Sequence, residues 1–396
     1  MTGKDIGMET ATLALPYLIA LIGIALLFDF LNGLHDAANS IATIVSTRVL
    51  RPQYAVLWAA FFNFIAFLFF GLHVAQTLGT GIVDAGIVDP QVILSALVGA
   101  IVWNVATWIL GIPSSSSHAL IGGLVGAGLT KAGPSVVVWS GLGKTVAAIV
   151  LSPLVGFVLA LLLVLAVSWA CVRATPFGVD RTFRSLQFVS ASLYSLGHGG
   201  NDAQKTMGII AVLLYAQGHL GSEFHVPLWV VLACQSAMAL GTLSGGWRIV
   251  HTMGSRITRL NPMQGFCAET GGAVTLFLAT WLGVPVSTTH TITGAIVGVG
   301  AARLGGALGG GRQHRDRLGG HHAGRRGHLR GLLSPHDAPR ALRRRGAARR
   351  DGRRSTRGPA RRRRGSFRVC GGGKQCGSVH AGAQGRSRPF CWPGRF

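Results

Sequence analysis

Long apolar runs separated by short polar segments make up most of the first 302 residues. The runs are Leu13–Phe28, Ala55–Leu72, Val92–Leu110, Val146–Val172, Val226–Leu243 and Ala273–Leu282. A helix needs about 20 apolar residues to cross the hydrocarbon core of a membrane, and several runs reach or approach that length. The pattern predicts an all-α polytopic membrane protein with roughly 9–11 membrane segments, broken ones included.

Two pairs of polar motifs interrupt these runs at matching places. Residues 111–128 read GIPSSSSHALIGGLVGAG and residues 283–300 read GVPVSTTHTITGAIVGVG. Upstream of each lies an acidic motif, NGLHDAAN at 32–39 and HGGNDAQK at 198–205, in which Asp36 aligns with Asp202. Duplicated units with polar breaks at corresponding positions are typical of secondary transporters. The first repeat is expected over about 12–172 and the second over about 183–302.

The charges of the loops predict how the chain crosses the membrane. The loops around residues 50, 178 and 253 carry arginine, whereas those around 86 and 222 carry acidic residues without Lys or Arg. Lys and Arg favour the cytoplasmic side, so the first three loops are predicted inside and the other two outside. The two acidic motifs are then crossed in opposite directions. We therefore expect two inverted-topology repeats, with broken or half helices that meet at a site near the bilayer midplane.

The acidic motifs place carboxylates inside membrane segments, where a charged side chain usually faces an ion path or a partner. Glycines at 33, 197, 199 and 200 predict that both helices unwind there and free backbone carbonyls. Carboxylate, amide and carbonyl oxygens suit a hard cation such as Na⁺. The candidate cation ligands are Asp36, Asp202, Asn32 and, from the polar patch NPMQGFCAETGG at 261–272, Glu269. The alternative is a buried polar network that only ties helices together, and for Glu269 both roles stay open.

The hydroxyl motifs each follow a proline and precede an apolar, glycine-rich stretch. Proline disfavours helix before it and Ser or Thr caps the helix that follows, so each motif predicts the start of a half-helix inside the membrane. Free backbone N–H groups and the helix dipole favour an anion at such a start. The candidate anion ligands are Ser114, Ser115, Ser116, Ser117, Ser287, Thr288 and Thr289. An ordinary helix cap at a loop is the alternative, and His118 and His290 are expected to be helix-start residues rather than proton carriers.

Four segments resemble the inorganic phosphate transporter (PiT) family, in particular bacterial low-affinity phosphate permeases. They are NGLHDAANSIAT (32–43), SLGHGGNDAQKTMGII (195–210), GGWRIVHTMGSRIT (245–258) and PVSTTH (285–290). The resemblance covers residues from about 15 to 302. It implies a multi-pass protein of the bacterial inner membrane, a symporter that moves inorganic phosphate with Na⁺ or H⁺ by alternating access.

The resemblance also implies one central site where the acidic and hydroxyl motifs meet. Asn39 and Asn201 join the expected phosphate ligands there, and Lys205 either contacts the anion or balances the acidic charge. Similar low-affinity uptake systems are thought to use protons and to carry metal–phosphate complexes. The expected partners are inorganic phosphate, a coupling cation and the lipid bilayer, and the chain is compatible with a homodimer. We expect no cofactor beyond the transported ions.

Two other function classes bear on this interpretation. A site of neutral donors does not by itself separate phosphate from sulfate, so a sulfate or other oxyanion permease of the same fold is the main alternative. No catalytic triad, nucleotide-binding loop or zinc-ligand spacing stands out, so the chain is not expected to be an enzyme.

The net charge of +24 is concentrated after residue 302. Residues 1–302, the predicted transmembrane domain, carry 12 Lys and Arg against 10 Asp and Glu, whereas residues 303–396 carry 25 Lys and Arg against 3 Asp. Such a segment cannot bury a core and is predicted to be disordered. It could bind RNA or anionic lipid through its arginines, which would make the chain a membrane-anchored binding protein, or it could be an inert tail. No nucleic-acid partner is expected.

A reading-frame shift in a GC-rich gene is a third origin of this tail, and the one we favour. The segment LGGGRQHRDRLGGHH at 308–322 can be back-translated with suitable synonymous codons. Moved forward by one nucleotide, it becomes the apolar WGVAGNIVIAWVVIT, which resembles a missing membrane helix. The gene sequence tests this hypothesis, because the absence of an apolar open frame under this region would refute it.

Overall fold

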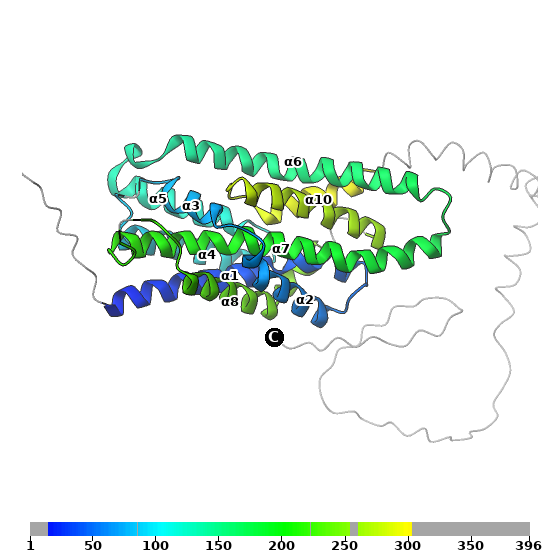
Figure 1. Cartoon of the computed structure of the whole chain (residues 1–396), viewed down its shortest axis with the longest axis horizontal. Helices are drawn as coiled ribbons and strands as arrows, with labels where there is room; N and C mark the ends of the chain where they lie inside the picture. The colour runs from blue at the N-terminus through cyan, green and yellow to red at the C-terminus, as the bar shows by residue number, and fades with distance from the viewer. Residues whose placement is uncertain (1–14, 85, 222, 254–259, 303–396) are drawn as a thin grey trace, which may run out of the picture. The chain divides into compact units, whose positions relative to one another are not determined.

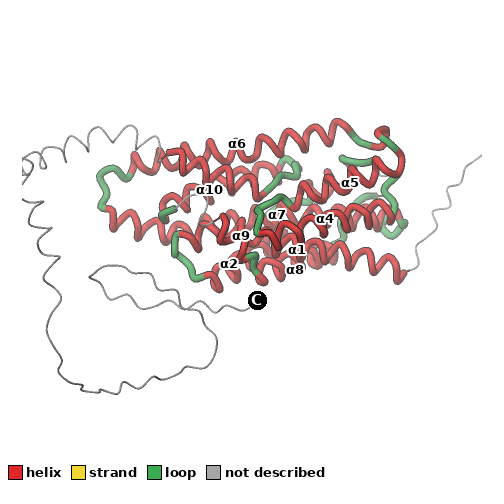
Figure 2. The backbone as a smooth tube through the Cα atoms, turned by 180° about the vertical axis from the view of Figure 1, so that it is seen from behind, coloured by secondary structure: helices red, strands yellow, loops and turns green. Residues whose placement is uncertain are grey.

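The apolar runs form long helices in the computed structural model, which describes residues 15–84, 86–221, 223–253 and 260–302 (Figure 1). These residues belong to one compact unit, and Figure 2 shows helix almost throughout, joined by short loops. The only β pairing among them is an isolated bridge between Val83 and Val137, so the predicted all-α class is confirmed. In chain order the elements are α1 (Leu15–Ser46), α2 (Pro52–Ile65), η1 (Ala66–Leu68), α3 (His73–Thr80), α4 (Pro90–Leu110), α5 (Ser116–Ala132), η2 (Pro134–Val136), α6 (Trp139–Ala170), α7 (Pro176–Ala216), α8 (Leu228–Ser244), α9 (Trp247–Thr252), α10 (Pro262–Trp281) and a last helix over 288–302.

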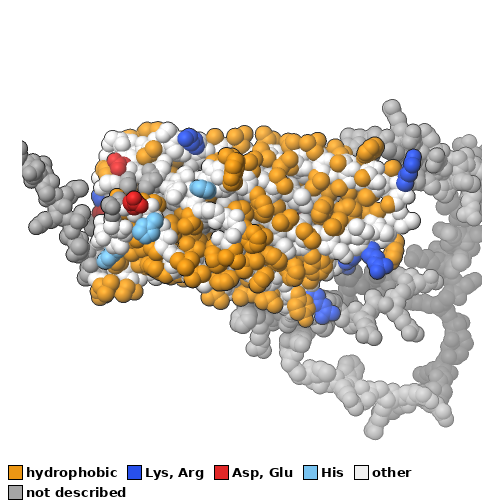
Figure 3. Space-filling view, in the orientation of Figure 1, with side chains coloured by type: hydrophobic (Ala, Val, Ile, Leu, Met, Phe, Trp, Pro, Cys, Tyr) orange, Lys and Arg blue, Asp and Glu red, His pale blue; other side chains and the backbone are white. Residues whose placement is uncertain are grey.

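The exterior of this helical unit is that of a multi-pass membrane protein. Within the described ranges, α1, α4 and α6 are each long and apolar enough to span a bilayer, and α2–η1 with α3, bent by 82°, is apolar enough for a broken span or a re-entrant loop. Figure 3 shows hydrophobic side chains covering most of one face, with Lys and Arg mainly toward one end and Asp and Glu toward the other. Such a band matches the hydrocarbon layer. The number of 9–11 segments stays a prediction, and the tail at 303–396 lies outside the described residues, so its predicted disorder and boundary stay predictions too.

The first and seventh helices run in opposite directions. Leu18, near the start of α1, lines the same cavity as Leu214, near the end of α7. Arg184, near the start of α7, donates a hydrogen bond from Nη1 to the carbonyl of Arg48, just after α1 (3.2 Å). The two acidic motifs therefore lie on antiparallel helices, as inverted repeats require.

Two helical hairpins enter the unit from opposite ends. The first, α4–α5, packs Val92 and Leu124 into a hydrophobic cluster with Leu21 from the first half of α1. The second, α10 with the helix over 288–302, packs into a separate cluster with Ile41 and Ile44 from the last part of α1. The tips of both hairpins contact each other. This arrangement is the predicted one, with half-helices that meet in the middle of the protein.

A pair of opposite charges holds the open end of the first hairpin. Lys131, in the last turn of α5, lies with Nζ 2.6 Å from Oδ2 of Asp89, which caps α4. Partial burial raises the pKa of Asp89. The hydrogen bonds from Lys131 and from the backbone lower it by more, so the carboxyl has a pKa below its ordinary value. The pair is therefore charged at neutral pH.

The predicted unwinding of α1 and α7 at the acidic motifs is wrong. Both helices are continuous through them, and their glycines instead allow other segments to approach closely. A side chain at Gly33 would collide with the carbonyl of Met238 on α8, and one at Gly199 would lie 2.5 Å from the carbonyl oxygen of Asn63 on α2. The breaks occur in the hairpin tips, where proline precedes each helix start.

The contact at Gly33 predicts a change in stability. Gly33→Ala should lower the free energy of unfolding by about 1–3 kcal/mol, because the added methyl group forces α1 and α8 apart. Gly23→Ala on the same helix is the matched control, since a methyl group there meets nothing within 4 Å. Thermal unfolding in detergent measures both variants. Equal melting temperatures for the two variants would contradict this account of the helix contact.

Candidate functional site

The hydroxyl motifs form capped helix starts at the two hairpin tips. Ser115 Oγ accepts a hydrogen bond from the backbone N–H of His118 (3.3 Å), and Ser287 Oγ accepts one from that of His290 (3.2 Å). The two histidine rings pack edge to face with their centroids 4.8 Å apart. Two helix starts that are 172 residues apart in the sequence therefore lie side by side.

The tips also bond directly to each other. Ser117 Oγ donates to the carbonyl of Val286 (3.2 Å), and Thr289 Oγ1 donates to the carbonyl of Ser114 (3.1 Å). Each bond joins a hydroxyl of one repeat to the backbone of the other. The tips thus form a single polar surface in the middle of the protein.

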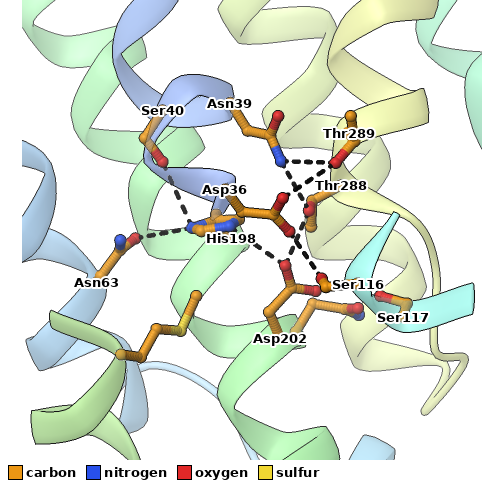
Figure 4. A network of polar contacts seen from close by, with 12 residues as sticks. Asp36, Asn39, Ser40, Asn63, Ser116, Ser117, His198, Asp202, Thr288 and Thr289 are labelled. Carbon is orange, nitrogen blue, oxygen red and sulfur yellow. Dashed lines mark hydrogen bonds and ion pairs between the residues drawn. The ribbon is translucent and has the colours of Figure 1, made fainter. Parts of the chain in front are cut away.

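The first acidic motif contacts both tips (Figure 4). Asp36 accepts hydrogen bonds from Ser116 Oγ of the first tip (2.9 Å) and from Thr289 Oγ1 of the second (3.3 Å). His35 Nδ1 lies 2.9 Å from the same carboxylate, which is buried. Asp36 is therefore shared between the two halves of the chain.

The second acidic motif makes the corresponding set of contacts. Asp202 accepts a hydrogen bond from Thr288 Oγ1 (2.8 Å), contacts the ammonium of Lys205 and lies 3.2 Å from His198 Nε2. The Lys205 ammonium also donates to Ser117 Oγ and to the carbonyl of Val286 (2.8 Å). Lys205 therefore joins the second acidic motif to both tips, and its charge is compensated by Asp202.

Two asparagines hold the second tip. Asn39 Nδ2 donates to the hydroxyls of Thr288 (3.3 Å) and Thr289 (2.9 Å). Asn201 Nδ2 donates to the carbonyl of Val284 (3.3 Å), and its Oδ1 accepts from the N–H of Val286 (3.3 Å). The structure thus brings together the candidate residues of the two acidic motifs, apart from Asn32, and those of the two hydroxyl motifs.

The chemistry of this cluster suits an anion together with a cation. Ligand atoms of Asp36, Asp202 and His198 all lie within 4.8 Å of one another. Carboxylate and hydroxyl oxygens suit a hard cation, and the hydroxyls and amides at two helix starts suit an oxyanion. A cavity of about 560 Å³ adjoins the first tip, and one of about 310 Å³ adjoins the second. Space for a small ligand therefore borders each tip.

Glu269 and Asn32 lie outside this cluster. Glu269 on α10 accepts hydrogen bonds from Thr43 and Ser190 and from Gln187 Nε2 (3.2 Å). Thr43 lies on α1, seven residues after Asp36. Asn32 lies on the other side of Asp36, beside Asp29. The sequence grouped both residues with the central carboxylates, but Asn32 lies about one helical turn before Asp36, and Thr43, which donates to Glu269, lies about two turns after it.

Sequence reasoning did not single out two further contacts to the cluster. His198 Nδ1 lies 3.2 Å from Asn63 Oδ1, and His35 Nε2 lies 3.1 Å from Thr107 Oγ1. One signal was present, because His198 stands four residues before Asp202 and so on the same helix face. Asn63 and Thr107 lie outside the repeated motifs and carried no signal.

Comparisons with known proteins agree with this architecture. The model of the phosphate transporter family matches residues 32–179 and 172–334. The chain is 81% identical over 293 residues to a probable low-affinity inorganic phosphate transporter of Rhizobium meliloti (strain 1021), covering 74% of this chain and 88% of that protein. It is 44% identical over 286 residues to a protein of the same description from Bacillus subtilis (strain 168), covering 72% and 86%.

A solved structure, described as the sodium-dependent phosphate transporter, has the same fold. It superposes with a TM-score of 0.67 at 26% identity and covers 73% of this chain and 90% of its own. These relatives are transporters by name and not enzymes. In sequence and in fold, the chain belongs to the phosphate transporter family.

Proposed function

We propose that this chain is a symporter that moves inorganic phosphate across the bacterial plasma membrane together with Na⁺ or H⁺. One observation carries the proposal. Hydroxyls from two oppositely oriented hairpin tips converge on Asp36 and Asp202. This places anion donors and cation ligands next to each other in the middle of the membrane. The names of the relatives support phosphate as the substrate.

Binding is proposed to proceed by exchange of hydrogen-bond partners. In the structure, Ser116, Thr288 and Thr289 donate to the two carboxylates. A cation at each carboxylate replaces these donors, and the released hydroxyls turn toward phosphate oxygens. Because neutral donors hold the anion, it can also leave, as transport requires.

The charge balance couples the two substrates. By formal charge, Asp36, Asp202 and Lys205 together carry −1. Phosphate adds at least one more negative charge, which is costly in a low-dielectric interior. Cations must therefore accompany it, and each substrate raises the affinity for the other.

The two hairpins support an alternating-access cycle. They enter from opposite ends of the unit, and a separate cavity adjoins each tip. We propose that the repeats rock about the central cluster, so that one hairpin opens while the other closes.

Uptake of labelled phosphate into liposomes that contain the purified full chain tests the proposal. Imposed Na⁺ and pH gradients, applied one at a time, identify the coupling ion, and addition or chelation of Mg²⁺ tests for a metal–phosphate substrate. Excess unlabelled sulfate should not compete. Uptake that follows no cation gradient would contradict symport, and strong competition by sulfate would assign the chain to the broader oxyanion class.

Glu269 is proposed to bind the coupling cation on its way to or from the centre. Glu269→Gln should raise the half-saturating cation concentration about tenfold, or ~1.4 kcal/mol, because a neutral amide replaces the buried charge. Initial uptake rates at varied Na⁺ and varied pH measure the effect. Glu223→Gln in an exposed loop is the matched control. An unchanged cation dependence in Glu269→Gln would leave Glu269 as a helix tie.

A further inference from the structure

A second buried carboxylate on α1, that of Asp29, lies outside the central cluster. Asp29 lies seven residues before Asp36 and is fully buried. Neither of its oxygens forms a hydrogen bond of normal geometry within the described part of the chain. The two central carboxylates differ in this respect, because Asp36 and Asp202 each accept hydrogen bonds from hydroxyls of the hairpin tips. Asp29 therefore lacks the compensation that the two central carboxylates have.

The neighbours of Asp29 offer more unpartnered oxygens. Thr206 on α7 and Asn32 on α1 lie beside the carboxylate, within reach of a hydrogen bond but without its normal geometry. Thr206 Oγ1 and Asn32 Oδ1 are themselves buried, and no hydrogen bond to either occurs among the described residues. The α8 neighbour is Cys234, a thiol that does not compensate a negative charge. The ammonium of Lys205 is already bonded to Asp202, Ser117 and Val286.

This set of atoms fits a sodium ion better than a structural tie or a proton. A residue that ties helices together forms well-aligned hydrogen bonds, and the contacts of Asp29 with Thr206 and Asn32 lack that geometry. A proton needs a single acceptor, whereas four unpartnered oxygens belong to the three side chains here. Oxygen atoms from carboxylate, amide and hydroxyl groups are the ligands that hard cations prefer.

We propose that Asp29, Asn32 and Thr206 form an additional Na⁺ site, separate from the central cluster. The proposal rests on the transport function proposed above and names a further binding site for its coupling ion. Along α1, Asp29, Asp36 and Thr43, which binds Glu269, follow one another at intervals of seven residues. Residues seven apart lie on one face of a helix, about 10.5 Å apart along its axis. The carboxylates of Asp29, Asp36 and Glu269 thus form a row through which Na⁺ reaches and leaves the central cluster.

The new site is electrostatically linked to the centre. The charges of Asp202 and Lys205 both act on Asp29, and Thr206 directly follows Lys205 on α7. Occupancy at Asp29 therefore depends on the charge of the central cluster. Phosphate binding, which makes the centre more negative, should strengthen Na⁺ binding at Asp29.

Counting bound sodium tests this assignment. Equilibrium binding of ²²Na⁺ to the purified full chain, in saturating phosphate, gives the number of sites in the wild type. Asp29→Asn keeps the shape of the side chain and should lower this number by one, while labelled phosphate still binds. Thr206→Val removes one ligand oxygen and should raise the half-saturating Na⁺ concentration for uptake about tenfold. Asp84→Asn, at an exposed loop position, is the matched control and should match the wild type.

The outcomes separate this site from the general function. An unchanged Na⁺ count in Asp29→Asn overturns the assignment, even if the pH dependence of uptake changes, because Asp29 would then bind a proton. Should Asp29→Asn not fold, as judged by thermal unfolding, Thr206→Val carries the test alone, and a wild-type Na⁺ dependence in that variant overturns the assignment. A wild-type chain without phosphate uptake refutes the proposed function, whereas normal uptake with an unchanged sodium count refutes only this site.

Discussion

Replacing Asp36 or Asp202 by asparagine is expected to abolish phosphate uptake while the protein still inserts into the membrane. Asparagine has nearly the same shape and can still accept hydrogen bonds from the hairpin tips. It lacks the negative charge that would hold a cation beside the phosphate. A loss of about 2.8 kcal/mol in ion binding corresponds to a hundredfold weaker site, so uptake should fall to about one-hundredth of the wild-type rate or less.

Asp180→Asn is the matched control for these variants. Asp180 lies in the first turns of α7 and pairs with Arg184 at an exposed position (2.8 Å). Exposed pairs contribute at most about 1 kcal/mol, so this variant should transport phosphate like the wild type. Membrane extraction and gel filtration show whether each variant is inserted and folded. Uptake at the wild-type rate in both Asp36→Asn and Asp202→Asn would remove these carboxylates from the mechanism.

The central cluster could be predicted from the sequence because the chain repeats itself. One polar motif inside an apolar run is ambiguous, since a helix cap or a helix tie has the same composition. A second copy at a matching position, on a helix that runs through the membrane in the opposite direction, places both copies near the midplane of the bilayer. The contacts Ser117–Val286 and Thr289–Ser114 are the result.

The path of the backbone through the motifs was harder to predict. Glycine permits both an unwound helix and a close helix contact, and the sequence around Gly33 or Gly199 does not distinguish them. The outcome depends on what packs against the glycine. Here Met238 and Asn63, both far away in the sequence, occupy that space. Only the three-dimensional structure could therefore show that α1 and α7 are continuous.

Asp29 carried no repeat signal either. It aligns with Ser195 in the second copy when Asp36 is aligned with Asp202, so the repeat offers no second carboxylate. Sequence reasoning could assign Asn32 to cation binding but could not place it beside Asp29 instead of Asp36. Both lie on the same helix, and a difference of one turn decides between them. The proposed Na⁺ site therefore groups Asn32 with Asp29 and Thr206 and not with Asp36.

The second large effect is expected at Lys205, the one ammonium in the central cluster as far as the structure describes it. Lys205→Met should abolish uptake and also destabilise the protein. The buried Asp202 would lose its counter-charge, and Ser117 and Val286 would lose their shared donor. Removing one partner of a buried ion pair typically costs about 3–5 kcal/mol. Thermal unfolding in detergent and phosphate uptake measure the two effects separately.

A second substitution separates charge balance from a direct role in transport. The double variant Asp202→Asn with Lys205→Met removes both charges, so its stability should recover most of the loss, because no buried charge is left unpaired. Its uptake should stay abolished, since the cation ligand is gone. Lys144→Met, at an exposed lysine beside the cavity at the second tip, is the control and should keep both stability and uptake. If Lys205→Met alone melts and transports like the wild type, the ammonium neither balances Asp202 nor contacts phosphate. In that case the −1 charge assigned to the central cluster, and the cation requirement derived from it, would have to be abandoned.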